Sequence, residues 1–225
     1  MKYIEIQKNH PEIFNNKNAL FEIITDSTQI EKWQEIRKKV LQDTGQPENW
    51  SEIGIVYEDP YIVILRDLVR FPNGDLRSYF RLLNTADLLG GKSCAILPIL
   101  KNKILLLNQY RHATRQWHWE IPRGFGEPNT NPTDNAIKEI HEEIGGEISE
   151  LINIGSYHSN TGIEGGTVIL FLARLKRIGR TNLDEGIKSA DLFDKEIVEK
   201  MIGDSEITDG FTIATYAKAK FKGLI

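Results

Sequence analysis

The spacing of apolar residues predicts one amphipathic helix near the amino terminus. After a strand-like opening stretch, an Asp-Ser-Thr sequence at residues 26–28 provides a helix start signal, and Gly45 ends the run. Between these limits the apolar residues recur at helical spacing, at Ile30, Trp33, Ile36, Val40 and Leu41. Residues 46–54 then look like a connection rather than a regular element.

Short apolar segments separated by turn residues predict a series of hairpins after this connection. Residues 55–65, 77–84 and 93–100 have strand character, and the Asn-Gly pair of FPNGD is a signal for a tight hairpin turn. Further strands are predicted in KILLLNQYRH, QWHWEIP and TVILFLARLKR, and two helical patterns follow within residues 189–223. Strands and helices mixed without regular βαβ alternation favour an α+β, or mixed α/β, sandwich.

Composition and charge narrow the class of protein. A chain of 225 residues with 40% apolar residues can bury a substantial core, and a net charge of -4 argues against a nucleic-acid partner. The single cysteine, Cys94, excludes an internal disulfide framework, and its apolar surroundings indicate a buried thiol. The chain lacks an apolar run long enough for a membrane span, and its start lacks the apolar region of a secretory signal. We therefore expect a soluble cytoplasmic protein without a membrane partner.

The segment PTDNAIKEIHEEIGG predicts a helix with well-defined ends. Asn131 is a favourable N-cap, Pro132 suits the first helical position, and Asp134 complements the helix dipole. Gly145 follows the last apolar residue, where a left-handed C-terminal position favours glycine. The predicted helix is about 13 residues long.

This helix carries an apolar stripe and an acidic stripe. Ala136, Ile137, Ile140 and Ile144 form the first, and Glu139, Glu142 and Glu143 form the second, roughly 120° away around the axis. Like charges three or four residues apart repel, at a cost of a few tenths of a kcal/mol for each pair. A divalent cation would reverse this balance, because Mg²⁺ and Mn²⁺ prefer hard oxygen ligands. A solvated acidic helix face is the alternative interpretation.

Residues 124–146 resemble the Nudix box, commonly written GX5EX7REUXEEXGU, where U is a bulky aliphatic residue. The matching positions are Gly124, Glu139, Ile140, Glu142, Glu143 and Gly145. Three positions depart from the pattern: Thr130 stands in place of the first glutamate, Lys138 in place of the arginine, and Gly146 in place of the final aliphatic residue. The departures at Thr130 and Lys138 affect contacts that orient the helix in the family, whereas the three glutamates are retained.

The resemblance implies a divalent-metal site. By analogy with the family, Glu143 and Glu139 would be the main ligands of Mg²⁺, with Mn²⁺ as a possible substitute, and Glu142 would assist. The backbone carbonyl of Arg123, or that of Gly124, would contribute a further oxygen.

Flanking segments are similar to the ADP-ribose pyrophosphatase branch of the family. The branch has a QYR strand before a WELPAG strand, and this chain has NQYRH and WEIPRG. The resemblance covers about residues 54–224 and implies a Nudix α/β/α sandwich at 93–225 and a β-rich subdomain at 54–92 that forms a homodimer. Residues 1–53 would be an extension with one helix.

The branch also suggests how a substrate would be bound and cleaved. Water would attack a pyrophosphate linkage, with Glu139 and Glu164 as catalytic residues, Glu164 acting as general base or as an extra ligand. Arg111 would bind a substrate phosphate, with Glu120 and Gly124 as further substrate contacts. An ordinary surface ion pair is the alternative for Arg111. The proline that usually follows the box in this branch is replaced by Thr161.

The predicted function is metal-dependent hydrolysis of a small nucleoside diphosphate derivative, with ADP-ribose or an ADP-sugar as the first candidate. A nucleotide-sugar-binding or regulatory protein with weak catalysis is the main alternative, and a nucleoside triphosphate hydrolase is a third. For Trp117 and Trp119, which alternate with polar residues on a strand, core packing is favoured over base stacking.

Overall fold

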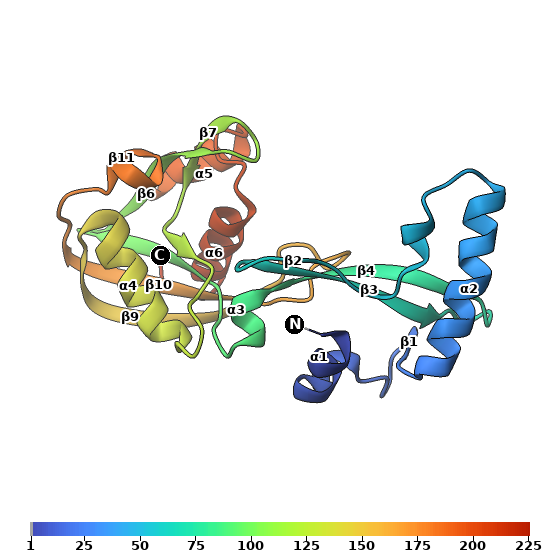
Figure 1. The fold of residues 1–225 in the computed structure, drawn as a ribbon. Coiled ribbons are helices and arrows are strands. Elements are labelled where there is room, and N and C mark those ends of the chain that lie inside the picture. Colours follow the sequence, from blue (N-terminus) through green and yellow to red (C-terminus); the bar gives the residue numbers. More distant parts are fainter. Residues whose placement is uncertain (1) are drawn as a thin grey trace. The chain divides into compact units, whose positions relative to one another are not determined.

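The computed structural model describes residues 2–225 and divides the chain into two compact units. Unit 1 comprises the residues up to Leu88 together with Asn160–Gly166, and unit 2 comprises Leu89–Ser159 and Thr167–Ile225. Figure 1 shows both units, with helices and strands labelled where there is room. In the part of the chain that the structure describes, no helix is long and apolar enough to cross a membrane.

Unit 1 is built around one antiparallel sheet in which β3 pairs with β1, β2 and β4. Its elements are α1 (Tyr3–Asn9), η1 (Pro11–Phe14), β1 (Glu22–Ile24), α2 (Ser27–Asp43), η2 (Glu48–Ser51), β2 (Gly54–Glu58), β3 (Ile62–Arg70), β4 (Leu76–Asn84) and α3 (Thr85–Leu88). The predicted helix after Asp26 is confirmed as α2, and the side chain of Asp26 accepts a hydrogen bond from Gln29 N. The hairpin predicted at Asn73-Gly74 joins β3 to β4.

Two predictions for this unit were wrong. The opening stretch is the helix α1 rather than a strand, because Ile6 and Tyr3, three residues apart, pack on the core while Ile4 is 52% exposed. The strand predicted at 55–65 is interrupted between β2 and β3. There the Asp59 carboxylate accepts hydrogen bonds from the N–H groups of Tyr61 and Ile62, which closes a turn.

Residues 1–53 share a sheet and a core with the strands that follow them. β1 pairs with β3, and Ile6 and Phe14 lie in the same apolar cluster as Val63 and Leu65. We expected divisions after residues 53 and 92, whereas the contacts give two units that separate after Leu88. The difference arises because a three-residue strand, β1, is too short to stand out in the sequence.

Unit 2 contains a seven-stranded mixed sheet between two layers of helices. Its elements are β5 (Cys94–Leu100), β6 (Lys103–Arg111), β7 (Gln116–Glu120), β8 (Arg123–Gly124), α4 (Pro132–Ile144), β9 (Glu147–Tyr157), β10 (Val168–Arg177), η3 (Leu183–Glu185), β11 (Ile187–Phe193), α5 (Lys195–Gly203) and α6 (Gly210–Phe221). The main path is β11-β6-β5-β10-β9, with β7 on β6 and β8 on β5, and β5 and β10 are parallel.

Successive residues of β5 point into two different cores. Ala95 and Leu97 pack with residues of α5 and α6, whereas Cys94 and Ile96 pack with Ala136 and other residues of α4. The sheet therefore has α4 on one face and α5 and α6 on the other (Figure 1). This arrangement confirms the predicted α/β/α sandwich. The burial of Cys94 is also confirmed, and it raises the pKa of the thiol to about 12.

Candidate active site

The helix α4 begins and ends where the sequence predicts. Asn131 Oδ1 accepts a hydrogen bond of 2.9 Å from Asp134 N, and Pro132 is the first helical residue. Gly145 has φ 57° and ψ 28°, the left-handed conformation that glycine adopts without strain. The thirteen residues between these caps hold the three glutamates at fixed positions on one rigid element.

The acidic stripe is divided between the sheet and the solvent. Glu143 is only 3% exposed, whereas the side chain of Glu142 is 46% exposed. Glu143 follows Ala136 by seven residues, which is almost two helical turns. Glu143 therefore lies within about 20° of Ala136 around the helix axis, on the side that faces the sheet. Ile137, placed on the apolar stripe by the sequence, is 46% exposed, and that part of the prediction was wrong.

Glu143 is a buried carboxylate with unused hydrogen-bonding capacity. It accepts a hydrogen bond from the backbone N–H of Arg123, while its Oε2 atom has no partner among residues 2–225. Burial raises the pKa of Glu143 to about 9, and repulsion from Glu139 and Glu185 adds to the increase. The positive charge of Arg111 acts in the opposite direction. A buried oxygen without a partner is costly, which fits a site that gains a ligand.

Glu139 lies against the backbone of Gly124. A Cβ atom at position 124 would be 1.9 Å from Glu139 Oε1, so any other residue there would displace this carboxylate from its position. Burial raises the pKa of Glu139 to about 7, with further contributions from the negative charges of Glu142 and Glu185. Glu139 and Glu143, which we call the two α4 carboxylates, therefore both contact segment 120–124, which we call the β7–β8 corner.

Glu185 is a fourth carboxylate that acts on the site electrostatically, and sequence reasoning missed it; it is exposed, and its Oε1 atom accepts a hydrogen bond of 2.9 Å from Asn182 Nδ2. It lies in η3, and its negative charge raises the pKa of both Glu139 and Glu143. Two hydrogen bonds hold this segment, from Asn182 N to Glu143 O at 2.9 Å and from Gln109 Nε2 to Glu185 O at 3.1 Å. No motif surrounds Glu185 in the sequence, so only the pairing of β11 with β6 reveals its position.

The arrangement around Glu139 and Glu143 fits a hard divalent cation. No group of three or more His, Cys, Asp or Glu side chains in residues 2–225 is arranged to hold a metal ion. A cation at this site would combine the two α4 carboxylates with backbone, water or substrate oxygens, and Mg²⁺ commonly keeps several such ligands. The unpartnered Glu143 Oε2 and the mutual repulsion of the carboxylates support this fit.

Arg111 and Arg123 share one buried carboxylate at the β7–β8 corner. Glu120, which is 2% exposed, accepts hydrogen bonds at Oε2 from Arg111 Nε at 2.8 Å and from Arg123 Nη2 at 3.2 Å. Arg111 is thus in an ion pair, as the alternative interpretation expected, but its partner is buried. A guanidinium held in this way keeps its remaining N–H groups in a fixed direction.

Comparison with known proteins identifies the family. Residues 91–209, just over half of the chain, match the family model described as the NUDIX domain. The chain belongs to the Nudix family. A crystal structure titled as an ADP compounds hydrolase has the same fold, with a TM-score of 0.64 at 15% identity, covering 77% of this chain and 95% of that one.

Two curated relatives are similar to parts of this Nudix protein. The methanol dehydrogenase activator of Bacillus methanolicus is 28% identical over 117 residues, which are 50% of this chain and 63% of the relative. Nucleoside diphosphate-linked moiety X motif 6 of Homo sapiens is 31% identical over 88 residues, which are 38% of this chain and 27% of the relative. The matched segments thus span less than two thirds of each relative.

The structure provides a replacement for the ion pair that the degenerate Nudix box lacks. Lys138 Nζ forms a short contact with Glu127 Oε1, and it also lies 3.8 Å from Glu142 Oε2. Glu127 precedes Thr130 by three residues in the same loop, and the Thr130 hydroxyl donates only a long hydrogen bond to Pro128 O. An ion pair between the loop and α4 is therefore present, with Glu127 rather than residue 130 as its carboxylate.

A double-mutant cycle measures this pair. We expect Glu127→Ala and Lys138→Ala to show a coupling free energy of about 0.2–1 kcal/mol in urea unfolding, because both side chains are partly exposed. The coupling should shrink as salt is added. A parallel cycle with Thr130→Ala and Lys138→Ala is the control and should be additive. If the free-energy changes of Glu127→Ala and Lys138→Ala are also additive, the Glu127–Lys138 ion pair does not stabilise the position of α4.

The remaining predicted residues are distributed between the two units. Glu164 belongs to unit 1, where it forms a bridge with Leu82 of β4, and the α4 glutamates belong to unit 2. Its catalytic role stays a prediction. Trp119 packs on Phe193 at the core, as predicted, whereas Trp117 is 51% exposed. Trp117 packs edge-on against Tyr110 instead, because β7 lies at an edge of the sheet.

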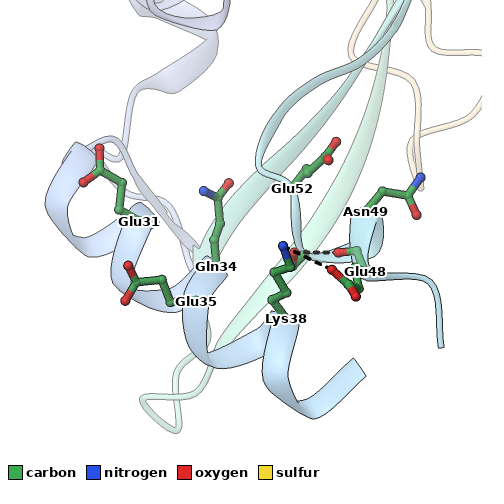
Figure 2. A pocket seen from close by; sticks show the side chains of 8 residues that line it. Glu31, Gln34, Glu35, Lys38, Glu48, Asn49 and Glu52 are labelled. Carbon is green, nitrogen blue, oxygen red and sulfur yellow. Dashed lines mark hydrogen bonds and ion pairs between the residues drawn. The ribbon is translucent and has the colours of Figure 1, made fainter. Parts of the chain in front are cut away.

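Unit 1 has a polar pocket that contains none of the predicted Nudix site residues. The pocket has a volume of about 610 Å³ and is lined by residues of α2 and of segment 48–52 (Figure 2). Its charged residues are Glu31, Glu35, Lys38, Glu48 and Glu52, and Lys38 is paired with Glu48 at 3.1 Å. An excess of carboxylates repels phosphate groups, so this pocket does not suit a nucleotide substrate.

Proposed function

We propose that this Nudix protein is a divalent-metal-dependent hydrolase of nucleoside diphosphates linked to another moiety, with ADP-ribose or an ADP-sugar as substrate. One observation carries the proposal: Glu143 is buried beside Glu139 with a free carboxylate oxygen, at a corner where Arg111 is held by Glu120. Carboxylates for a cation and a guanidinium for phosphate thus occur together on the α4 face.

In this proposal Glu139 and Glu143 hold Mg²⁺ or Mn²⁺ together with the backbone carbonyl of Arg123, and Glu142, whose side chain is 46% exposed, assists through its negative charge. The bound cation neutralises phosphate charge and lowers the pKa of water. Both glutamates must be ionised to bind the cation, and because burial raises the pKa of Glu139 to about 7 and that of Glu143 to about 9, cation binding releases protons. Because Gly124 has no side chain, the Glu139 carboxylate can lie directly against the backbone of the β7–β8 corner.

Arg111 is proposed to bind the pyrophosphate, with Glu120 and Gly124 forming the adjacent wall. Glu120 holds the Nε and Nη2 atoms of Arg111 at 2.8 Å and 2.5 Å, which orients the guanidinium before a substrate arrives. Preorganisation of this kind reduces the entropy lost on binding. A guanidinium also matches two phosphate oxygens better than an ammonium group does.

Water attacks one phosphorus atom in the proposed reaction, and the bridging P–O bond breaks. The products are a nucleoside monophosphate and the phosphorylated second moiety. A carboxylate accepts the proton of the attacking water, and Glu185 and Glu164 are the two candidates. Glu185 is supported by its electrostatic effect on both α4 glutamates. Glu164 is supported by the family resemblance of its loop.

The ADP moiety is supported by the similar fold of a protein titled as an ADP compounds hydrolase. A homodimer is part of the same proposal. Its support is the resemblance of the unit 1 sheet to the dimer-forming sheet of the branch and the exposure of Tyr79 and Phe80 on β4. Sedimentation at several protein concentrations would detect a dimer.

A substrate panel tests the proposed function. ADP-ribose, other nucleotide sugars, dinucleotides and nucleoside triphosphates are incubated with Mg²⁺ or Mn²⁺, and the nucleotide products are quantified. We expect metal-dependent release of AMP from ADP-ribose or an ADP-sugar, with slower cleavage of triphosphates. Turnover of triphosphates alone would contradict the substrate assignment.

A regulatory or nucleotide-sugar-binding protein with weak catalysis is the second candidate. It is favoured by the similarity to a relative named as an activator and by the departures at Thr130 and Lys138. Calorimetry on the same panel distinguishes the two functions. Tight binding without turnover of any compound would support the regulatory candidate.

A further inference from the structure

The first turn of α6 contacts the β7–β8 corner from the face of the sheet opposite α4. Thr212, which is fully buried, accepts a hydrogen bond of 3.0 Å from Ile121 N at its Oγ1 atom. The same hydroxyl donates to Asp209 Oδ2 at 2.7 Å. A continuous chain of hydrogen bonds therefore runs from the corner backbone to the carboxylate that caps α6.

Arg123 forms a second link between the corner and this turn. Its Nη2 atom lies 3.8 Å from Asp209 Oδ1, and its guanidinium lies 4.3 Å from the centre of the Phe211 ring. The same guanidinium donates to Glu120, the carboxylate that holds Arg111. Thr212 thus contacts Ile121, and Asp209 and Phe211 contact Arg123.

The corner supplies several of the groups used in the proposed reaction. Glu120 orients Arg111, the N–H of Arg123 holds Glu143, and Gly124 lies against Glu139. Its sheet contacts come from Glu120, which pairs with Leu107 of β6, from Pro122 O, which accepts a hydrogen bond of 2.9 Å from Ile96 N, and from the two residues of β8, which pair with β5. A small displacement of this short segment would move the groups that contact both α4 glutamates and Arg111.

We infer that the first turn of α6 sets the position of the active-site corner, with Thr212 and Asp209 as positioning residues. Thr212 transmits the constraint to the Ile121 amide, and Asp209 transmits it to Arg123. This inference rests on the proposed function, because it assigns the two residues a role in metal and substrate binding through the corner.

The test compares Thr212→Val with Thr212→Ser. Valine keeps the shape and removes the hydroxyl, so we expect the Mn²⁺ dissociation constant to rise about 10-fold and kcat/KM for ADP-ribose to fall about 10-fold, typical of groups that orient metal ligands. Serine keeps the hydroxyl and should restore both values to near those of the unaltered protein. Exchange of the Ile121 amide with solvent should accelerate in the valine variant alone.

Thr215→Val is the matched control. Thr215 is also fully buried in α6, but its hydroxyl donates at 2.6 Å to Phe211 O within the same helix. We expect Mn²⁺ affinity and Ile121 exchange to stay near those of the unaltered protein, even if the unfolding midpoint drops.

Equal losses in Thr212→Val and Thr215→Val, or a Thr212→Val variant with unaltered Mn²⁺ affinity and Ile121 exchange, would overturn the inference. If the unaltered chain hydrolyses no compound of the panel, the proposed function fails separately. The Mn²⁺ affinities and the exchange rates still decide the positioning role in that case.

Discussion

Glu143→Gln is expected to lower kcat for the preferred substrate by about 1,000-fold, equivalent to about 4 kcal/mol of transition-state stabilisation. Glutamine has nearly the same volume, but it lacks the charge that a cation needs at a site only 3% exposed. The affinity for Mn²⁺ should fall as well. Steady-state kinetics and calorimetry on the same preparation measure both effects.

The same substitution should change how metal-free stability depends on pH. The pKa of Glu143 is raised from 4.5 to about 9 in the folded protein, so the folded state keeps a proton that the unfolded state releases. The stabilisation is complete below pH 4.5 and is lost as pH rises toward 9. Urea unfolding with a chelator should therefore show stability decreasing less steeply with pH in Glu143→Gln than in the unaltered protein.

Glu31→Gln is the control for this pH effect, because it removes the same charge from an exposed position on α2. Its stability should follow the pH dependence of the unaltered protein. If stability falls equally steeply with pH in Glu143→Gln and in the unaltered protein, Glu143 is ionised in the folded, metal-free state. That result would contradict the raised pKa of Glu143.

Glu185→Gln is expected to lower kcat by about 100-fold or more while Mn²⁺ affinity changes little, if Glu185 accepts the proton of the attacking water. The substitution also removes a negative charge that raises the pKa of Glu139 and Glu143. The pH profile of kcat should therefore move as well as its height, and kinetics across a pH series would measure both changes.

Glu164→Gln is the matched comparison for the proton acceptor, since it makes the same chemical change in unit 1. A large loss of kcat in Glu164→Gln with normal turnover in Glu185→Gln would assign proton transfer to Glu164 and contradict the role given to Glu185. Full activity in Glu164→Gln would remove that residue from the mechanism.

Local signals explain why much of the fold could be predicted. The caps of α4 at Asn131 and Gly145 and the N-cap of α2 at Asp26 act within a few residues, so sequence is sufficient to place them. β9 was missed, and residues 189–193 of β11 were wrongly included in a helical pattern, for the opposite reason. β9 is an irregular edge strand with register shifts, and β11 is held by its distant pairing with β6.

The candidate site shows the same division between local and long-range information. Glu139, Glu142 and Glu143 follow from a pattern on one helix, and Arg111 follows from its strand motif. The burial of Glu143, the approach of Glu185 and the use of Glu127 as the partner of Lys138 depend on which segments pack together. No spacing rule along the chain contains that information.

Hydrolysis of ADP-ribose in ¹⁸O-labelled water with Mg²⁺ tests the central claim most directly. Mass spectrometry of the products should find AMP and a phosphorylated ribose, with one labelled oxygen in one of the two phosphates, and neither product should form without metal. A chain that binds ADP-ribose and Mg²⁺ but forms no labelled product from it, or from any nucleoside diphosphate derivative, would contradict the claim.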